Sequence, residues 1–353
     1  MTPRQQEVFD LQQEGKSERQ IAKALGISRR TVRSHMVRID PAIKEAMDSF
    51  GLDTIPSQVW LKNKGYSVQV RPQKENLVEK IRRAFNDIPA APQIEGPLFC
   101  LKDMMTVYPF FDVHLGLRAH AEISGEEMNL ELGVKRVLNA MSAAMAGAPA
   151  SHKAVILNGG DFTHQTDDMN RTRRSGHVLD VDGRNIFTVR EAIEVISSCI
   201  EMALTKHEVV EYYSVPGNHD PQNWETIIIG LSERYREHNR VAISFSVMEF
   251  SVVEHGEVAL FIHHGDKRTP KDLSMYCAAR FPEVWGRTRF RVLITGHLHH
   301  LKADEFPGIY WWQMPAITAP DAHAAGGYLS HSLMKAITFD RNRCSAPTFL
   351  SST

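Results

Sequence analysis

The sequence lacks the features that mark disulfide-bonded, membrane-spanning and strongly basic proteins. Its four cysteines lie far apart without a CxxC pair, which predicts reduced, unpaired thiols rather than a disulfide framework. No apolar run approaches the roughly 20 residues that cross a bilayer, and the first residues are polar. The formal net charge is -1, so nucleic-acid binding cannot be inferred from overall charge. We therefore expect a cytoplasmic protein without membrane contact, whose charge must be examined locally.

The first 40 residues have the pattern of short helices separated by turns. Ser17 and Gln20 have the spacing of a capping box, and Gly26 follows the second helix where a positive φ is needed. Ala22 and Val32 fall where the helices of such a module pack together. The pattern predicts a small all-α helix-turn-helix domain over residues 1–50.

The third helix of this module is basic and suits contact with phosphates and base edges. The stretch SERQIAKALGISRRTVRSH resembles the helix-turn-helix of response-regulator output domains and of sigma-factor region 4. This resemblance implies binding to nucleic acid, most simply DNA; a basic helical bundle for dimerisation or docking is the alternative. The candidate DNA-binding residues are Arg29, Arg30, Arg33 and Arg38.

The remainder of the chain divides into two parts that differ in composition and in predicted secondary structure. Residues 51–97 are rich in proline and predict a connector with a hairpin or wing around Asn63-Lys64-Gly65 and a helix over residues 75–85. Beyond Pro97, strand-like runs alternate with helical patterns, which predicts one α/β domain over residues 98–353.

Five short polar clusters in this domain each follow an apolar, strand-like run. Such clusters lie at the carboxyl ends of strands, where α/β sheets build their sites. Carboxylates and imidazoles at these ends can ligate metal ions, and the adjacent glycines let the backbone approach. The clusters are Asp112-Val-His114, Gly160-Asp161, Gly217-Asn218-His219-Asp220, His264-Gly265 and Gly296-His297-Leu-His299.

In this order, the five clusters resemble the signature of the calcineurin-like metallophosphoesterases. The resemblance spans about residues 98–340, and it implies an α/β fold, a β-sandwich flanked by helices. It also implies a pair of metal sites that share Asp161. The implied ligands are Asp112, His114, Asp161 and His299 for one metal, and Asp161, Asn218, His264 and His297 for the other.

The implied ligands are all nitrogen and oxygen donors, which suit two divalent ions such as Mn²⁺, Fe²⁺, Ni²⁺ or Zn²⁺. We favour Mn²⁺. The family resemblance implies that a metal-bridging hydroxide attacks the phosphate and that His219 donates a proton to the departing oxygen. Asp220 is expected to orient His219, because a carboxylate beside an imidazole raises its pKa and fixes its tautomer.

Departures from the family pattern narrow the range of expected substrate classes. Phe111 stands where the family often has glycine or serine, so tight packing is expected beside the first metal site. The second cluster lacks the Asp-Arg-Gly extension of Ser/Thr protein phosphatases, and the third ends in Asp220 rather than glutamate. These differences favour the repair-nuclease and phosphodiesterase branch.

A long segment, residues 167–190, follows the second cluster and carries several arginines. Long loops at the carboxyl end of a strand often hold substrate. Arg171, Arg173 and Arg174 are therefore candidate substrate contacts, and a solvated basic loop is the alternative.

The leading hypothesis is a metal-dependent nuclease that hydrolyses phosphodiester bonds in nucleic acid and is positioned on DNA by the N-terminal module. The alternatives are a small-molecule or nucleotide phosphatase or phosphodiesterase that uses the helix-turn-helix for assembly, and a DNA-binding regulator with a sensory phosphoesterase domain. The architecture is similar to that of phage proteins, which implies the host cytoplasm. Helix-turn-helix modules often bind in pairs, so a homo-oligomer is expected.

Overall fold

The structure is a computed structural model that describes residues 4, 7–8, 10–11, 14–32, 59–63, 66–70, 90–172, 176–319 and 334–345. The chain divides into two compact units, residues 1–84 and 85–353. The units are connected through residues outside the described ranges.

The first unit contains a capped helix and a turn in the positions that the sequence predicts. Helix α2 (Glu18–Leu25) follows Ser17, whose backbone amide donates to the Gln20 side chain at 2.9 Å. It ends at Gly26, which has a φ of 62°. The hydroxyl of Ser28 accepts from the amide of Thr31 at 3.0 Å and so starts the next helical turn. The helices enclose a small core of Val8, Ile21, Ala22 and Val32.

A β-hairpin completes the described part of this unit. Strands β1 (Val59–Asn63) and β2 (Tyr66–Val70) pair antiparallel, with Val59 opposite Val70 and Asn63 opposite Tyr66. The predicted helix over residues 75–85 lies outside the described residues.

The second unit contains two five-stranded mixed sheets. In the first, β3, β4, β5 and β6 run parallel and β12 pairs antiparallel with β3. Its strands, in sheet order, are β12 (Ile337–Phe339), β3 (Leu101–Phe110), β4 (Ser151–Asn158), β5 (Val209–Ser214) and β6 (Val241–Ile243).

In the second sheet, β11, β9 and β8 run parallel, and the edge strands β10 and β7 are antiparallel to their neighbours. Its strands, in sheet order, are β10 (Lys302–Phe306), β11 (Ile309–Gln313), β9 (Phe290–Thr295), β8 (Val258–Ile262) and β7 (Ser251–His255).

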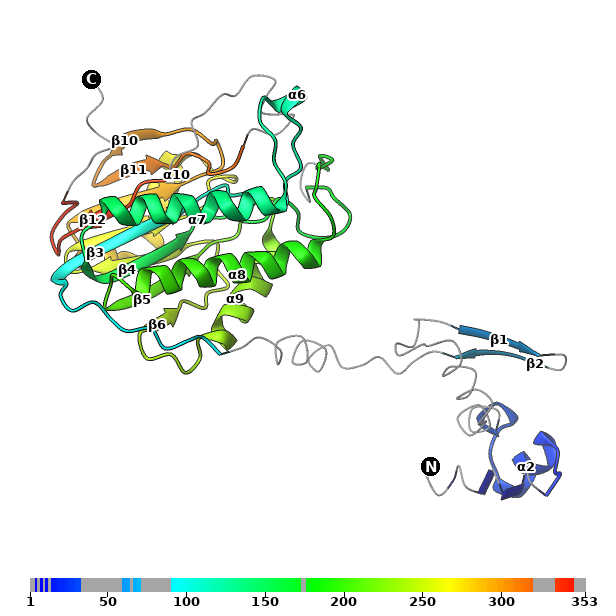
Figure 1. Ribbon diagram of the computed structural model, residues 1–353. Helices are drawn as coiled ribbons and strands as arrows, with labels where there is room; N and C mark the ends of the chain where they lie inside the picture. Colours follow the sequence, from blue (N-terminus) through cyan, green and yellow to red (C-terminus); the bar gives the residue numbers. More distant parts are fainter. Residues whose placement is uncertain are drawn as a thin grey trace. The chain divides into compact units, whose positions relative to one another are not determined.

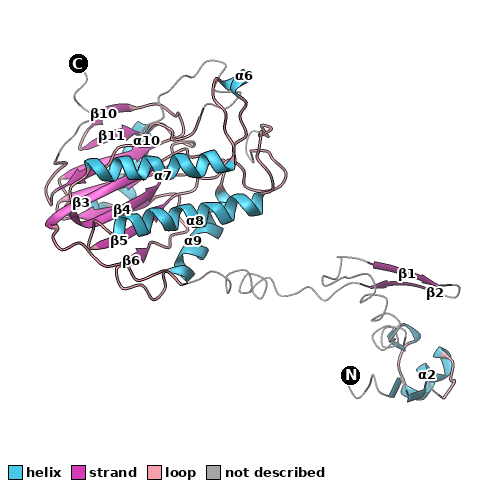
Figure 2. Cartoon of the chain, in the orientation of Figure 1, coloured by secondary structure: helices cyan, strands magenta, loops and turns pink. Residues whose placement is uncertain are grey.

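Helices cover the outer face of each sheet (Figures 1 and 2). The first sheet is covered by α7 (Leu130–Gly147), α8 (Asn185–Leu204) and α9 (Pro221–Arg234), and the second by α10 (Pro270–Arg280) and α11 (Pro282–Arg287). The short α6 (Ala121–Ser124) precedes α7. The predicted α/β fold class, a β-sandwich flanked by helices, is confirmed.

Strand periodicity builds these layers, because successive side chains point to opposite faces of a sheet. In β3, Val107 packs between the sheets and Tyr108 packs under the helices. In β8, Leu260 faces the first sheet and Phe261 faces α10 and α11. Each central strand therefore contributes to two hydrophobic cores and is held firmly in position.

Three further observations bear on the predictions. The four cysteines are all buried, and none of them forms a disulfide. Residues 90–97 belong to the second unit and are bonded to the rest of it: the amide of Ala91 donates to the carbonyl of Arg234 at 3.3 Å, and the carbonyl of Ile94 accepts from Arg240 at 2.5 Å. Among the described helices, none has the length and apolar character to cross a membrane.

Candidate metal centre

All five polar clusters follow central strands of the sandwich. They come directly after β3, β4, β5, β8 and β9. Within each sheet these strands are parallel, so their carboxyl ends lie at a common edge. Backbone hydrogen bonds join neighbouring clusters, as the amide of His114 donates to the carbonyl of Asp161 at 2.9 Å and that of Gly296 donates to the carbonyl of His264 at 2.8 Å.

One group of donor atoms comes from the first and fifth clusters. Asp112, His114 and His299 present ligand atoms within 4.8 Å of one another. The Nε2 atoms of His114 and His299 are 3.2 Å apart, and Oδ1 of Asp112 lies 3.4 Å from Nε2 of His299. The carboxylate of Asp112 also accepts from the amide of His297 at 2.9 Å, which fixes its orientation.

A second group lies next to the first. Asp161, His264 and His297 also have ligand atoms within 4.8 Å of one another. Nε2 of His264 lies 3.1 Å from Oδ2 of Asp161, 3.2 Å from Oδ1 of Asn218 and 3.9 Å from Oδ1 of Asp112. Because His264 reaches both carboxylates, the two groups are adjacent. The structure thus brings together all seven residues that the sequence analysis names as ligands.

Burial and mutual charge set the electrostatics of these groups. Burial alone would raise the pKa of Asp161, but His264, His219 and His114 together outweigh it and lower that pKa well below its usual value. Burial would likewise lower the pKa of His264, but the carboxylates of Asp161 and Asp112 raise it to about 10. Burial, followed by the proximity of His219, holds the pKa of His114 well below its usual value. The positive charge of protonated His264 therefore compensates the negative charge of the buried carboxylates of Asp161 and Asp112.

The donor groups suit a divalent cation in that position. Nδ1 of His264 lies 3.0 Å from the carbonyl oxygen of Gly159, so Nδ1 keeps its proton, and a cation that replaced the proton on Nε2 would meet a lone pair there. Metal-ligating histidines usually have such a partner on their second nitrogen. The donors are all oxygen and nitrogen, which excludes the thiolate set of a structural zinc site. The seven residues therefore fit divalent metal ions.

The backbone at the centre is held in an uncommon conformation. Six non-glycine residues in the described ranges have positive φ, and five belong to the candidate site. Each costs about 1 kcal/mol or more for a residue with a side chain, so the surrounding hydrogen bonds must enforce it. The five are Asp112, His114, Asp161, His297 and His299, with φ values of 50°, 47°, 53°, 70° and 60°.

Glycines make room for close contacts at the centre. A Cβ atom at Gly217 would lie 1.9 Å from Oδ1 of Asp161. The ring of Phe111 is fully buried, and Cβ atoms at Gly159 and Gly296 would lie 1.8 and 2.6 Å from it. The tight packing expected around Phe111 is thus present, and these two glycines accommodate it.

His219 adjoins the donor groups, with its ring centroid 4.7 Å from that of His114. Its amide donates to Oδ1 of Asp161 at 2.7 Å, and its Nδ1 lies 2.9 Å from the carbonyl oxygen of His164. That carbonyl, and not Asp220, makes the contact that fixes the His219 ring. No motif in the sequence had pointed to a role for His164.

Asp220 has a different set of partners. Its buried carboxylate accepts from the amides of Phe162 at 2.7 Å and Gly217 at 2.9 Å, which joins the second and third loops. Burial, together with the charge of Asp161, raises the pKa of Asp220 to about 6. His164 is also buried, and burial followed by the charge of His219 lowers its pKa to about 3. A neutral His164 can accept from Nδ1 of His114, 3.2 Å away.

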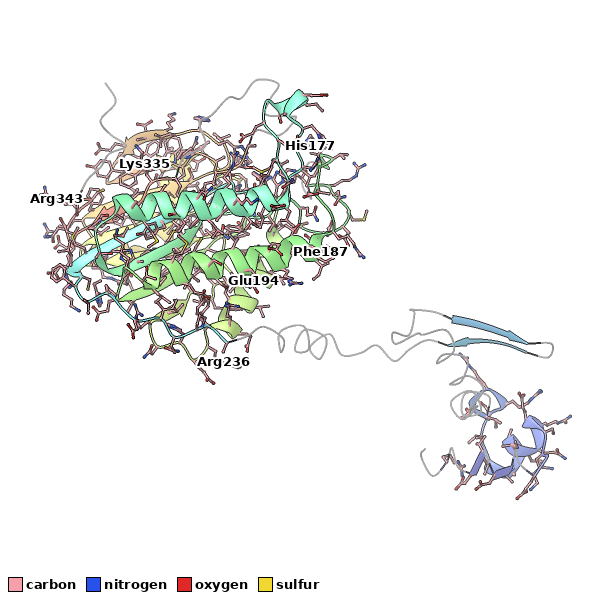
Figure 3. The ribbon with its side chains drawn as sticks, in the orientation of Figure 1. His177, Phe187, Glu194, Arg236, Lys335 and Arg343 are labelled. Carbon is pink, nitrogen blue, oxygen red and sulfur yellow. The ribbon has the colours of Figure 1, made fainter. Side chains whose placement is uncertain are left out.

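The arginine-bearing segment after β4 is shorter than expected, because α8 already begins at Asn185. Nη1 of Arg171 donates to the carbonyl of Gly176 at 3.1 Å, and Arg184 pairs with Asp168 at 3.1 Å. These contacts fold the segment on itself. Figure 3 shows His177, within the segment, and Phe187 at the end of the domain where α8 begins. Arg173 and Arg174 lie outside the described residues.

In the first unit, Arg29 and Arg30 are exposed at the start of the third helical segment. Nη2 of Arg29 lies 3.8 Å from a carboxylate oxygen of Glu18. Arg33 and Arg38 lie outside the described residues.

Comparisons with known proteins identify the N-terminal module. Residues 1–39 match the family model described as sigma-70, region 4, in agreement with the resemblance seen in the sequence. Among curated proteins, no sequence matches the chain.

Solved structures similar to the chain include phosphoesterases. Yfce, a phosphoesterase from E. coli, is 14% identical and covers 67% of this chain and 88% of its own, with a TM-score of 0.34. A predicted phosphoesterase from Streptococcus pneumoniae TIGR4 is 13% identical, with 67% and 84% covered and a TM-score of 0.30. An archaeal phosphodiesterase is 15% identical, with 60% and 84% covered and a TM-score of 0.31. At these values the likenesses carry no conclusion about the activity of this chain.

Proposed function

We propose that this chain is a metal-dependent phosphodiesterase that hydrolyses nucleic acid. The observation that carries the proposal is the pair of adjacent donor groups, Asp112–His114–His299 and Asp161–His264–His297, at the carboxyl ends of parallel strands. Two divalent ions held there would stabilise charge on a phosphate and lower the pKa of a bound water. We favour Mn²⁺, which carboxylate oxygens suit, although the imidazoles would equally accept Fe²⁺, Ni²⁺ or Zn²⁺.

The ligand assignment follows from which atoms face one another. Asp112, His114 and His299 would hold one ion, and His264, His297 and Asn218 would hold the other. Asp161 is assigned to both, because its Oδ2 lies 3.1 Å from His264 and its carboxylate also interacts electrostatically with the His114 side chain. Fixed donors of this kind need little reorganisation when a phosphate binds.

His219 is proposed as the general acid that protonates the departing oxygen. Because Nδ1 faces the carbonyl of His164, that nitrogen carries a proton and Nε2 is the atom left for the substrate. The His219 amide donates to the Asp161 carboxylate, which fixes the position of the proposed acid relative to the metal ligands. Asp220, which holds the loops of Phe162 and Gly217 together, is proposed to position them rather than to act on His219 directly.

Nucleic acid is the proposed substrate because of the N-terminal module. Residues 1–39 match sigma-70 region 4, and Arg29 and Arg30 are exposed on its third helical segment. Arg33 and Arg38 follow them in the sequence and add to the local positive charge. We propose that residues 1–50 bind DNA, that residues 51–97 join them to the enzyme, and that residues 98–353 form the catalytic domain, with Arg171, Arg173 and Arg174 near the substrate.

The test is a substrate panel with the full-length chain. Single-stranded DNA, duplex DNA, RNA and bis-p-nitrophenyl phosphate are each incubated with Mn²⁺ and with EDTA. Mn²⁺-dependent cleavage of a nucleic acid is the expected result. Cleavage of the small diester alone would contradict the nucleic-acid substrate and indicate a small-molecule phosphodiesterase. Absence of hydrolysis with every divalent ion would contradict the enzyme itself.

A further inference from the structure

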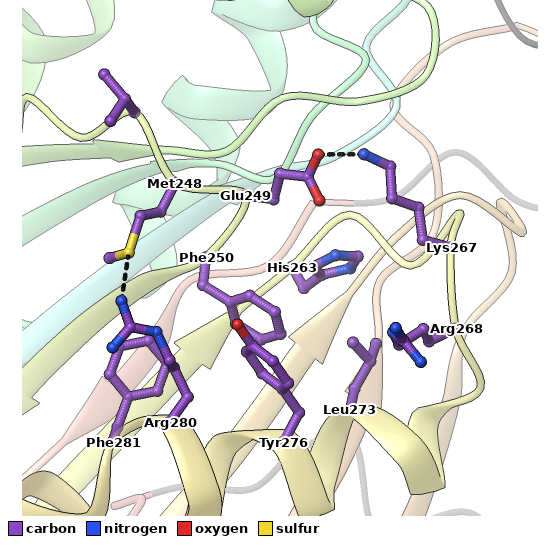
Figure 4. Close-up of a pocket in the computed structure, with 11 residues that line it drawn as sticks. Met248, Glu249, Phe250, His263, Lys267, Arg268, Leu273, Tyr276, Arg280 and Phe281 are labelled. Atoms are coloured by element: carbon purple, nitrogen blue, oxygen red, sulfur yellow. Dashed lines mark hydrogen bonds and ion pairs between the residues drawn. The ribbon is translucent and has the colours of Figure 1, made fainter.

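A hollow of about 780 Å³ lies on the helix-covered side of the second sheet. It is bounded by residues 247–250, by His263 at the end of β8 and by α10. Figure 4 shows a pair of aromatic rings at its centre, with Arg280 on one side and Lys267 and Arg268 on the other. The volume lies in the range of small-molecule sites. The hollow is not part of the candidate metal centre.

The aromatic pair provides a flat surface. The rings of Phe250 and Tyr276 are stacked, with centroids 5.0 Å apart and planes at 23°. Phe250 is 8% exposed and is supported by His263, whose ring centroid is 4.7 Å away. Tyr276 remains 42% exposed. One face of the Tyr276 ring is therefore backed by Phe250, and its exposed surface lies in the hollow.

Positive charge surrounds this surface. Lys267, Arg268 and Arg280 line the hollow together with one carboxylate, Glu249, which pairs with Lys267. Within the described part of the chain, Arg268 and Arg280 form no ion pair with a carboxylate; Arg280 contacts only the sulfur of Met248 at 3.7 Å and the Phe281 ring at 5.9 Å. The hollow thus combines an aromatic face with two guanidinium groups that lack anionic partners.

A second hollow leads from there toward the metal centre. Its volume is about 490 Å³, and it shares Lys267 and Arg268 with the first. Its lining includes Gly265 and Gly296, which adjoin His264 and His297 in the sequence. The two hollows therefore form neighbouring spaces that extend from the loops of the candidate ligands to Tyr276.

We propose that this hollow, defined as the Tyr276 subsite, binds a nucleotide unit of the substrate. A nucleobase stacks on Tyr276, and the adjoining phosphate is bound by Arg268 and Arg280. Stacking on an aromatic ring combined with cationic contacts to the backbone is how proteins bind single-stranded nucleic acid without reading its sequence. An apolar ligand would leave the guanidinium groups without anions, and an inorganic anion would leave the ring unused. The inference deepens the proposed function and rests on it for the substrate class.

Binding without hydrolysis tests the subsite. The full-length chain in EDTA is titrated into a fluorescein-labelled single-stranded tetranucleotide, and anisotropy gives Kd. A single strand this short offers no major groove to the helix-turn-helix module. We expect Tyr276→Ala and Arg268→Gln each to raise Kd roughly 5- to 100-fold, the loss typical of one stacked base or phosphate contact. Tyr276→Phe should retain the affinity.

Matched controls are available nearby. Met275→Ala removes the exposed neighbour of Tyr276 that does not line the hollow, and Arg289→Gln removes an exposed arginine elsewhere. Both should bind like the wild type. Should Tyr276→Ala fail to fold, Arg268→Gln carries the test, since Arg268 is an exposed loop residue.

Two outcomes would overturn the proposal: no binding of the tetranucleotide by the wild type, or unchanged affinity in both Tyr276→Ala and Arg268→Gln. Neither depends on hydrolysis. The substrate panel with Mn²⁺ tests the catalytic function separately, so a failure of the subsite and a failure of the enzyme give different results.

Discussion

At the residue scale, side-chain size and backbone conformation decide whether the donor groups can meet. Gly217 leaves space for the carboxylate of Asp161, which a Cβ atom would approach to 1.9 Å. Asp161 itself has a φ of 53°, and its neighbour Gly160 has a φ of 95°. Main-chain hydrogen bonds between loops hold these conformations. The geometry of the centre thus depends on residues that contribute no ligand atom.

Replacing Gly217 with alanine should weaken metal binding. The added methyl group would displace the Asp161 carboxylate, and changes beside a ligand typically cost about 10- to 100-fold in metal affinity. Calorimetric titration with Mn²⁺ measures the change. Gly147→Ala is the control, because a Cβ at Gly147 would meet nothing within 4 Å. Equal affinities in the two variants would show that Asp161 does not need its present position.

His219→Asn should slow hydrolysis according to the leaving group. Asparagine retains a donor that can reach the carbonyl of His164 but removes the atom proposed to protonate the departing oxygen. The rate with an alkoxide leaving group, as in DNA, should fall about 10²- to 10⁴-fold, the usual range for general acid catalysis. With bis-p-nitrophenyl phosphate the loss should be much smaller, because p-nitrophenolate departs without a proton.

The control for His219 is His300→Asn, since the exposed His300 likewise directs Nδ1 to a carbonyl, that of Leu298, at 2.7 Å. It should leave both rates near those of the wild type. An equal loss with both substrates in His219→Asn would contradict a proton-donating role.

At the element scale, the strand ends could be predicted and the pairing of strands could not. The apolar runs that form β3, β4, β5, β8 and β9 stop where polar residues begin, so the clusters after them were visible in the sequence. The pairing of β12 with β3, which places Ile337 opposite Val107, joins distant parts of the chain. Edge strand β10 carries the polar sequence KADEF, which has no strand-like apolar run.

The partners of polar side chains at the site were also beyond the sequence. The contact of His219 with the carbonyl of His164, and of Asp220 with the amides of Phe162 and Gly217, depends on the course of three loops. Several residues in these loops have positive φ, which a propensity for strand or helix does not specify. Residue types predicted the donors, but loop conformation determined their neighbours.

A buried histidine at the opposite ends of these strands makes stability depend on pH. Nε2 of His207 lies 2.8 Å from the Tyr108 hydroxyl of β3, and Nδ1 lies 2.8 Å from the Ser151 hydroxyl of β4. Burial lowers the pKa of His207 to about 4. An unfolded histidine titrates near 6.5, so between these values the unfolded chain binds more protons. The free energy of unfolding therefore rises with pH over this window. The contribution of His207 is lost when the pH falls through it.

Urea unfolding at pH 7 and at pH 4.5 measures this contribution, which is at most about 3 kcal/mol. In His207→Asn, the decrease in unfolding free energy between the two pH values should be smaller than in the wild type. His120→Asn, at an exposed position, should retain the full decrease. If His207→Asn and the wild type lost the same free energy, the buried neutral histidine would not be a source of the pH dependence.

At the scale of the whole molecule, a module that matches sigma-70 region 4 and an α/β sandwich lie in one chain. The module has its own small core around Ile21 and Val32, and the donor groups lie wholly within the second unit. The two activities proposed for the chain, binding DNA and hydrolysing a diester, are therefore assigned to separate residues. Substitutions in one unit should leave the chemistry of the other intact.

Replacing Arg29 and Arg30 together with glutamine should weaken binding to duplex DNA and reduce its salt dependence. Each lost phosphate contact lowers the slope of log affinity against log salt by about 1. Hydrolysis of bis-p-nitrophenyl phosphate should be unchanged. Arg236→Gln, an exposed site on the second unit, serves as the control for lost charge. Unchanged DNA affinity and slope in the double variant would assign the module to assembly or docking.

The most direct test of the central claim compares the wild type with Asp161→Asn. Bound metal is measured by elemental analysis after dialysis against Mn²⁺, and hydrolysis of bis-p-nitrophenyl phosphate is followed in the same samples. Asp168→Asn is the control, because Asp168 is an exposed loop residue whose ion-pair partner is Arg184. We predict that Asp161→Asn loses bound metal and hydrolysis together while Asp168→Asn retains both. Hydrolysis at the wild-type rate in Asp161→Asn would contradict the proposed metal centre.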